Sequence, residues 1–144
     1  MFDWYFQELI EILERLDRRE ESHKSVNHKN EKNTLEVLEV LEDLEEILSQ
    51  IRVTVHSVKN PVEKENFTKL SQIAWNRLGL ERSVLRIQSS NYRGSESLRE
   101  RLLQRVQSEI LECKCECEKS IASVVILIKE STERGGRSEK KWFQ

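Results

Sequence analysis

The sequence predicts an all-α fold, built as a four-helix bundle or as long antiparallel helical hairpins with coiled-coil-like seams. The chain has only 4 glycines and 1 proline in 144 residues, and 35% of its residues are charged. Such a composition is poor in turn formers and typical of long helices. Apolar residues recur at spacings of three and four along most of the chain, which is the period of one helix face, and no strand pattern competes with it.

We expect a single helical domain over residues 1–130, followed by a basic, flexible tail over 131–144. The first helix is predicted at 2–21, because apolar residues there form one face. This face consists of Phe2, Phe6, Leu9, Ile10, Leu13 and Leu16. A polar stretch without periodicity follows, which predicts a loop.

The second helix is predicted at 34–58, where apolar residues follow one another in alternating steps of four and three. They are Val37, Leu41, Leu44, Leu48, Ile51, Val55 and Val58, an uninterrupted heptad seam. Leu35, Leu38 and Ile47 widen this seam. We therefore expect the front half of the helix to touch more than one neighbour.

The third helix is predicted at 61–88, because a proline pushes the residue before it out of the helical region while itself suiting a first turn. The fourth and longest helix is predicted at 97–130. At 1.5 Å per residue it would span about 50 Å, more than its neighbours. We expect Val124 and Ile128, in its last turns, to lie beyond the cover of the shorter helices, so that a second subunit shields them in a homodimer.

Three cysteines alternate along this fourth helix: Cys113, Cys115 and Cys117. On a helix, Cys113 and Cys117 would lie on the buried seam as small hydrophobic residues, while Cys115 would face away from them. Thiolates bind zinc or cuprous copper, but this spacing turns the middle thiol aside and no second cluster supplies a fourth ligand. We therefore predict no metal site and no cofactor. A symmetric dimer could bring two Cys115 side chains together.

Charge is unevenly distributed, although the net charge is only -2. From Glu31 to Gln50 there are seven acidic residues and one lysine. The basic residues between Leu70 and Cys113 are all arginine: Arg77, Arg82, Arg86, Arg93, Arg99, Arg101 and Arg105. Guanidinium groups pair with carboxylates or phosphates. This stretch therefore predicts a solvated face, internal or inter-subunit pairing with the acidic helix, or contact with an RNA or DNA backbone.

Arg18 and His23 are separated by four residues, a spacing that a helical-bundle ribonuclease would need to place both groups at one phosphodiester. Both residues lie at a helix end beside a charged loop, where basic side chains are ordinary. An enzyme is accordingly the last of three function hypotheses, and we assign no catalytic residue.

Six of the nine aromatic residues lie near the two ends of the chain: Phe2, Trp4, Tyr5, Phe6, Trp142 and Phe143. Aromatic side chains bury much area in protein interfaces with few rotatable bonds. Together with Val124 and Ile128, they are predicted to contact a protein partner. The sequence thus favours a non-enzymatic helical interaction and assembly protein. The alternative is a small dimeric RNA- or DNA-binding protein that uses the arginine stretch.

The longest apolar run, from Ile121 to Ile128, is too short to cross a bilayer, which needs roughly 20 residues. The first residues include Asp3, Glu8 and Glu11 and lack the basic start and the cleavage site of a signal peptide. We expect a soluble, intracellular protein of the cytoplasm or nucleus, with neither a membrane partner nor a small-molecule substrate.

Overall fold

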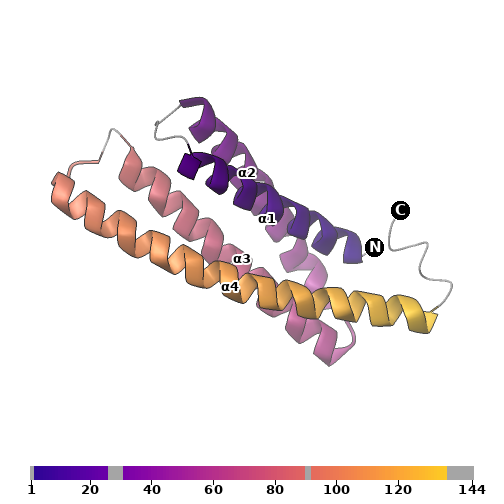
Figure 1. Cartoon of the computed structure of the whole chain (residues 1–144). Helices are drawn as coiled ribbons and strands as arrows, with labels where there is room; N and C mark the ends of the chain where they lie inside the picture. The colour runs from indigo at the N-terminus through magenta and orange to yellow at the C-terminus, as the bar shows by residue number, and fades with distance from the viewer. Residues whose placement is uncertain (1, 26–30, 90–91, 136–144) are drawn as a thin grey trace.

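The computed structural model describes residues 2–25, 31–89 and 92–135, with side chains described within 4–19, 34–89 and 92–130. The elements are α1 (Phe2–Ser25), α2 (Glu31–Thr54), the short 3-10 helix η1 (Val55–Ser57), α3 (Pro61–Gln88) and α4 (Glu96–Gly135) (Figure 1). These ranges contain no strand. The predicted all-α fold with four α-helices is therefore confirmed.

The helices form two antiparallel hairpins, α1 with α2 and α3 with α4, which meet where α2 packs on α3 (Figure 1). Buried apolar residues from all four helices belong to one core cluster. The ring of Phe6 in α1 stacks on the ring of Phe67 in α3, with 4.4 Å between the centroids. Side chains of the first hairpin thus reach into the second.

α1 buries the face that its sequence predicts, and it is longer than predicted. Phe6, Leu9, Leu13 and Leu16 are buried. The helix continues to Ser25 instead of ending at residue 21. The added residues are polar but include neither glycine nor proline, so nothing in this stretch interrupts the helix.

α2 confirms the heptad seam, whose buried members are Val37, Leu41, Leu44, Leu48 and Ile51. Val55 and Val58, beyond its last turn, are partly buried against the same core. Ile47 is buried as expected, but Leu35 and Leu38 are 61% and 39% exposed. The expectation that these two leucines widen the buried seam is wrong, because they project from the hairpin on the side away from the core.

α3 has the predicted bounds, and the structure shows what begins the helix. The side-chain oxygen of Asn60 accepts hydrogen bonds from the backbone N–H groups of Val62 and Glu63, at 2.9 and 3.2 Å. Pro61 occupies the first helical turn, where its missing N–H would have no helical partner. The Asn-Pro pair therefore serves both as the end of the preceding segment and as the N-terminal cap of α3.

α4 is the longest element, with 40 residues, which corresponds to about 60 Å of helix. Ser95 caps its start, because its hydroxyl accepts a hydrogen bond from the backbone N–H of Leu98 at 3.1 Å. The predicted boundary at residue 130 is too early, since the helix continues to Gly135. None of the described helices offers a stretch long and apolar enough to span a membrane.

The turn between α3 and α4 lies beyond the other hairpin, at the left of Figure 1. Every described residue from 82 to 109 is exposed or only partly buried. We call this segment, with its turn, the α3–α4 arm. The start of the arm still contacts the rest of the fold, since Arg82 pairs with Glu45 of α2 and Leu85 packs against the core. Farther along, each helix of the arm can cover only the side that it turns to the other, which explains why full burial begins again at Ile110.

Candidate functional site

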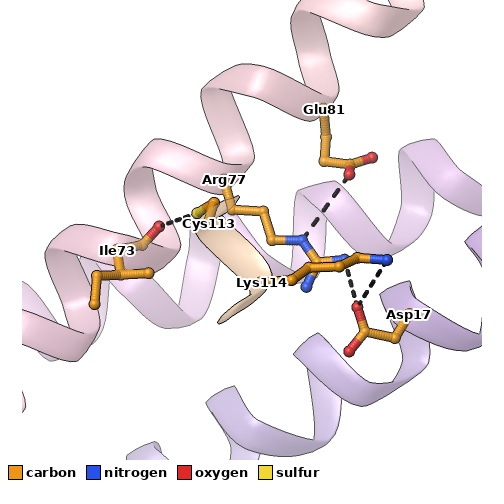
Figure 2. A network of polar contacts seen from close by, with 6 residues as sticks. All are labelled: Asp17, Ile73, Arg77, Glu81, Cys113 and Lys114. Carbon is orange, nitrogen blue, oxygen red and sulfur yellow. Dashed lines mark hydrogen bonds and ion pairs between the residues drawn. The ribbon is translucent and has the colours of Figure 1, made fainter. Parts of the chain in front are cut away.

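A cluster of four charged side chains lies where α1, α3 and α4 meet (Figure 2). Arg77 of α3 is only 1% exposed. Its Nη2 lies 2.6 Å from Oδ1 of Asp17 in α1, and its Nε lies 3.9 Å from Oε1 of Glu81. Nζ of Lys114 in α4 is 3.7 Å from the same Asp17 oxygen. Two cations and two carboxylates from three helices therefore balance one another inside the fold.

This cluster fixes how the helices sit and leaves Arg77 little contact with solvent. Burying a charge is expensive unless opposite charges and hydrogen bonds compensate it. Arg77 and Glu81 fall on the same α3 face as the buried residues Phe67, Leu70 and Ala74. A polar pair at helical spacing on an apolar stripe is the sequence signal that would have identified this site, and the sequence prediction missed it.

Cys113 and Cys117 lie on the buried seam of α4 and Cys115 is exposed, as predicted. The thiol of Cys113 donates a hydrogen bond to the backbone carbonyl of Ile73, at 3.4 Å (Figure 2). Burial raises the pKa of the Cys113 thiol, against an opposing effect of the Arg77 cation. Burial likewise raises the pKa of Cys117, to about 12. Both thiols are therefore protonated near neutral pH and ill suited to act as thiolate nucleophiles.

Metal coordination needs several ligands that converge on one point. The described residues contain no group of three or more histidine, cysteine, aspartate or glutamate side chains that could hold an ion. Within the described part of the chain, the three cysteines thus occur as two buried thiols and one outward-facing thiol.

The arginine stretch divides into residues with different roles. Arg77 belongs to the buried cluster and cannot reach a nucleic-acid backbone, so its assignment to a phosphate-binding face is corrected. Arg82 pairs with Glu45 of the acidic helix α2. Arginines of α1 do the same, since Arg15 pairs with Asp43 at 2.9 Å and Arg19 pairs with Glu36 at 2.5 Å. Several arginines therefore join the helices to one another.

Arg99 stabilises the turn between α3 and α4. Its guanidinium donates to the backbone carbonyl of Ser89 at 3.3 Å, lies 3.5 Å from Glu96, and stands over the ring of Tyr92, 4.8 Å from the centroid. The remaining members of the stretch are exposed: Arg86, Arg93, Arg101 and Arg105. Only these four retain the accessibility that a phosphate-binding face requires.

The two residues of the ribonuclease hypothesis are not brought into a described site. Arg18 is exposed on α1. The backbone of His23 belongs to the same helix, but its side chain lies outside the described residues. Their cooperation therefore remains a prediction.

The predicted aromatic contacts differ in accessibility. Trp4 is 47% exposed, Tyr5 is partly buried against it with the rings edge to face, and Phe6 is buried. Phe6 is a core residue and cannot be a surface contact, because its ring stacks on Phe67. The side chain of Phe2 lies outside the described residues. Trp142 and Phe143 do so too.

Val124 and Ile128 were expected to need a second subunit for cover, and this expectation is wrong. Both are buried within the single chain, in the same cluster as Phe6 and Phe67. The prediction counted helix lengths but not helix positions. Side chains of α1 and α3, among them Phe6 and Phe67, belong to that cluster, so the cover for the end of α4 comes from within the chain.

Three exposed apolar residues of α4 lie on the side of the helix that is turned away from its buried seam, and they were not predicted. Leu111 and Ile126 are each 55% exposed, and Val125 is 37% exposed. Their positions follow from a turn of about 100° per residue, counted from the buried cysteines. That count was available from the sequence once the buried seam had been recognised.

A groove of about 290 Å³ runs between α3 and α4. Its lining includes Asn66, Lys69, Ile73, Glu116, Lys119 and Ser120. Charges of both signs stand beside small polar side chains, so the lining favours no particular class of small molecule. The outer helix faces therefore offer the more informative surface.

No known protein family, curated protein or solved structure matches this chain. The function must be argued from the residues and their arrangement.

Proposed function

We propose that this chain is a non-enzymatic helical interaction protein, which assembles with protein chains through the outer faces of its helices. The observation that carries the proposal is the set of large apolar side chains left exposed on those faces. Besides the exposed residues of α4, they include Trp4, Leu35, Val53 and Val62. Contiguous exposed apolar surface is typical of protein interaction sites, whereas single residues of this kind are common on any surface.

Two of these exposed residues, Trp4 of α1 and Val53 of α2, lie at the same end of the first hairpin. The pair Arg15–Asp43 sets the antiparallel register of α1 and α2. Trp4 lies eleven residues before Arg15, and Thr54 lies eleven residues after Asp43, so Trp4 and Thr54 are at the same height along the antiparallel pair. Val53, the residue before Thr54, is 74% exposed. This end of the first hairpin therefore exposes a tryptophan and an aliphatic side chain, and tryptophan is among the residues that contribute most to protein interfaces.

The ion pairs support the same proposal. Three arginines form ion pairs with carboxylates of α2: Arg15, Arg19 and Arg82. These arginines therefore join helices of the same chain, and their presence does not require a phosphate-bearing partner. The acidic surface of α2 would in addition repel a phosphate backbone brought close to it.

A second candidate function, binding of RNA or DNA, is favoured by one observation. Arg86, Arg93, Arg101 and Arg105 are exposed on the α3–α4 arm, and none forms an ion pair with another residue of the described ranges. Arg86 donates a hydrogen bond to the hydroxyl of Ser83 at 3.3 Å. Exposed guanidinium groups without a carboxylate partner can contact phosphates. The candidate therefore concerns the arm and not the whole arginine stretch.

One experiment separates the two functions. The full chain is analysed by size-exclusion chromatography with light scattering, with and without duplex RNA, at about 50 and 200 mM salt, because phosphate contacts weaken steeply as salt rises. We expect self-association without RNA and no RNA complex at the higher salt.

The proposed function would be overturned by micromolar or tighter RNA binding at the higher salt that is lost when Arg93, Arg101 and Arg105 are all changed to Ala. Arg99 is left intact, since it stabilises the turn. Arg52→Ala, at an exposed position of α2, is the matched control for loss of positive charge.

A further inference from the structure

The outer face of α2 carries a second stripe at heptad spacing, opposite the seam that the core buries. The steps along it are 4, 3, 4, 3 and 4, and we call this set of exposed residues the outer α2 stripe: Leu35, Glu39, Glu42, Glu46, Ser49 and Val53. With about 100° between successive residues, they lie within an arc of about 80°. Such a repeat keeps one stripe facing a partner helix over several turns.

The flanks of α2 show which cation the carboxylates of this helix accept within the chain. Three flank carboxylates each pair with an arginine of α1 or α3: Glu36, Asp43 and Glu45. The three carboxylates of the outer α2 stripe form no ion pair with any residue that the structure describes. Because like charges three and four residues apart on a helix are destabilising, cations on a partner would relieve their repulsion.

The α3–α4 arm offers cations at the matching spacing. Arg101 and Arg105 are exposed on one side of α4, about 40° apart around the helix. They are four residues apart in sequence, and so are Glu42 and Glu46. Neither arginine forms an ion pair with a residue of the described ranges. The two arginines therefore match two carboxylates of the stripe in charge and in spacing.

The stripe is not covered within one chain. Leu35 and Val53, at its two ends, are 61% and 74% exposed. The ion pair between the arm and α2 lies on a flank of that helix, at Glu45. We propose that the stripe is covered by the α3–α4 arm of a second copy of this chain, with Arg101 and Arg105 facing Glu42 and Glu46. The inference rests on the proposed function and specifies its partner and its surfaces.

A second copy satisfies both surfaces at once. An RNA or DNA backbone can pair with the arm, but it leaves the carboxylates of α2 without cations. Because the stripe and the arm are different surfaces, the contact is either made twice across a two-fold axis or repeated from copy to copy. Exposed ion pairs contribute little each, so we expect a weak association that decreases as the salt concentration rises.

Charge reversal tests the pairing in the full chain. One variant carries Glu42→Arg with Glu46→Arg, and places like charges opposite the arm. The other carries Arg101→Glu with Arg105→Glu. By light scattering, we expect each variant to raise the dissociation constant by about tenfold or more. The chain with all four changes has the net charge of the native chain and should associate as strongly, because opposite charges face each other again.

A matched control separates the contact from net charge. Glu65→Arg with Glu118→Arg changes the net charge as much as the α2 variant does, at exposed positions outside both surfaces. This control should associate like the native chain. Thermal melting should be little changed in every variant, because all the changed side chains are exposed. Equal weakening by the control, or no recovery in the chain with four changes, would overturn the contact.

Cross-linking locates the contact and its direction. Chains with Ser49→Cys are mixed with chains with Leu98→Cys or Ser108→Cys, all in the Cys115→Ser background. A short bis-maleimide joins two nearby thiols, since each S–H adds across one double bond. With the arginines facing the glutamates, Ser49 lies level with Leu98 if the helices are antiparallel and with Ser108 if they are parallel. One of these mixtures should therefore cross-link. Cross-linking in neither, or equal cross-linking with Ser123→Cys, would overturn the contact.

The outcomes separate this inference from the proposed function. Self-association that survives both charge-reversal variants would overturn the contact between the arm and α2 and leave the interaction function in place. A chain that stays monomeric at about 100 μM and about 50 mM salt, where even weak interfaces form, would overturn the second copy as partner. Salt-resistant RNA binding through the arm would instead overturn the proposed function.

Discussion

Arg77 and Arg101 are the same residue type in one hairpin, yet the fold gives them opposite environments. Arg77 is buried between Asp17 and Glu81 in the region where α1, α3 and α4 meet. Arg101 is exposed on the α3–α4 arm, where only two helices pack together. The difference arises from the number of neighbouring helices and not from the local sequence. An arginine-rich stretch therefore cannot be assigned one role before its neighbours are known.

The largest effect should come from removing the buried arginine. Arg77→Ala leaves Asp17 and Glu81 without their shared cation, and we expect the free energy of unfolding to fall by about 3–5 kcal/mol. Arg101→Ala, the control, should change it by no more than about 0.5 kcal/mol. Urea unfolding followed by circular dichroism measures both. Equal effects of the two changes would show that burial does not distinguish these arginines.

A smaller effect is expected for the buried thiols of the same region. Cys113→Ala together with Cys117→Ala removes two buried sulfur atoms and should lower the free energy of unfolding by about 1–3 kcal/mol. Cys115→Ser should leave the stability of the monomer nearly unchanged, because its thiol is exposed. If purified protein contained stoichiometric zinc, or if a chelator unfolded it, the cysteines would be metal ligands and not buried hydrophobic residues.

The smallest effect concerns alkaline pH. Burial raises the pKa of Cys117 from its ordinary value of 9.0 to about 12. The unfolded chain then loses this proton before the folded chain does, so the contribution to stability is complete below pH 9 and decreases as the pH rises towards 12. The slope should be about 1.4 kcal/mol per pH unit for this thiol.

Denaturant unfolding between pH 8 and about 10.5 tests this expectation, a window in which the unfolded thiol titrates and the folded one does not. The control is Cys117→Ala, in which the decrease should be shallower than in the native chain. Identical slopes would mean that lysine and tyrosine titrations cause the whole effect.

The sequence was sufficient for the features that depend on local periodicity. The α2 seam, the bounds of α3 and the opposite orientations of Cys115 and Cys117 all follow from helical spacing. Helix ends were less predictable where no glycine, proline or capping residue marks them. The extension of α4 to Gly135 is such a case.

Features that depend on which helices lie opposite one another were not predictable. Val124 is buried in a core cluster to which α1 and α3 also contribute side chains, and Leu35 is exposed because nothing in the described part of the chain packs on that side of α2. Arg77 was placed on a possible nucleic-acid face because its partner Asp17 lies sixty residues earlier in the sequence. The spacing of apolar residues predicts which face of a helix is apolar, but it does not predict which helix covers that face.

The order in which the helices pack has a consequence for how the chain folds. Each helix packs mainly on its neighbour in sequence, α1 on α2, α2 on α3 and α3 on α4. Contacts of this kind close short loops and carry a small entropic cost, which favours rapid folding. The contacts of Asp17 with Arg77 and Lys114 are of a different kind, since they join α1 to helices that are not its neighbours in sequence. They require that both hairpins already lie side by side, so they complete the structure instead of initiating it.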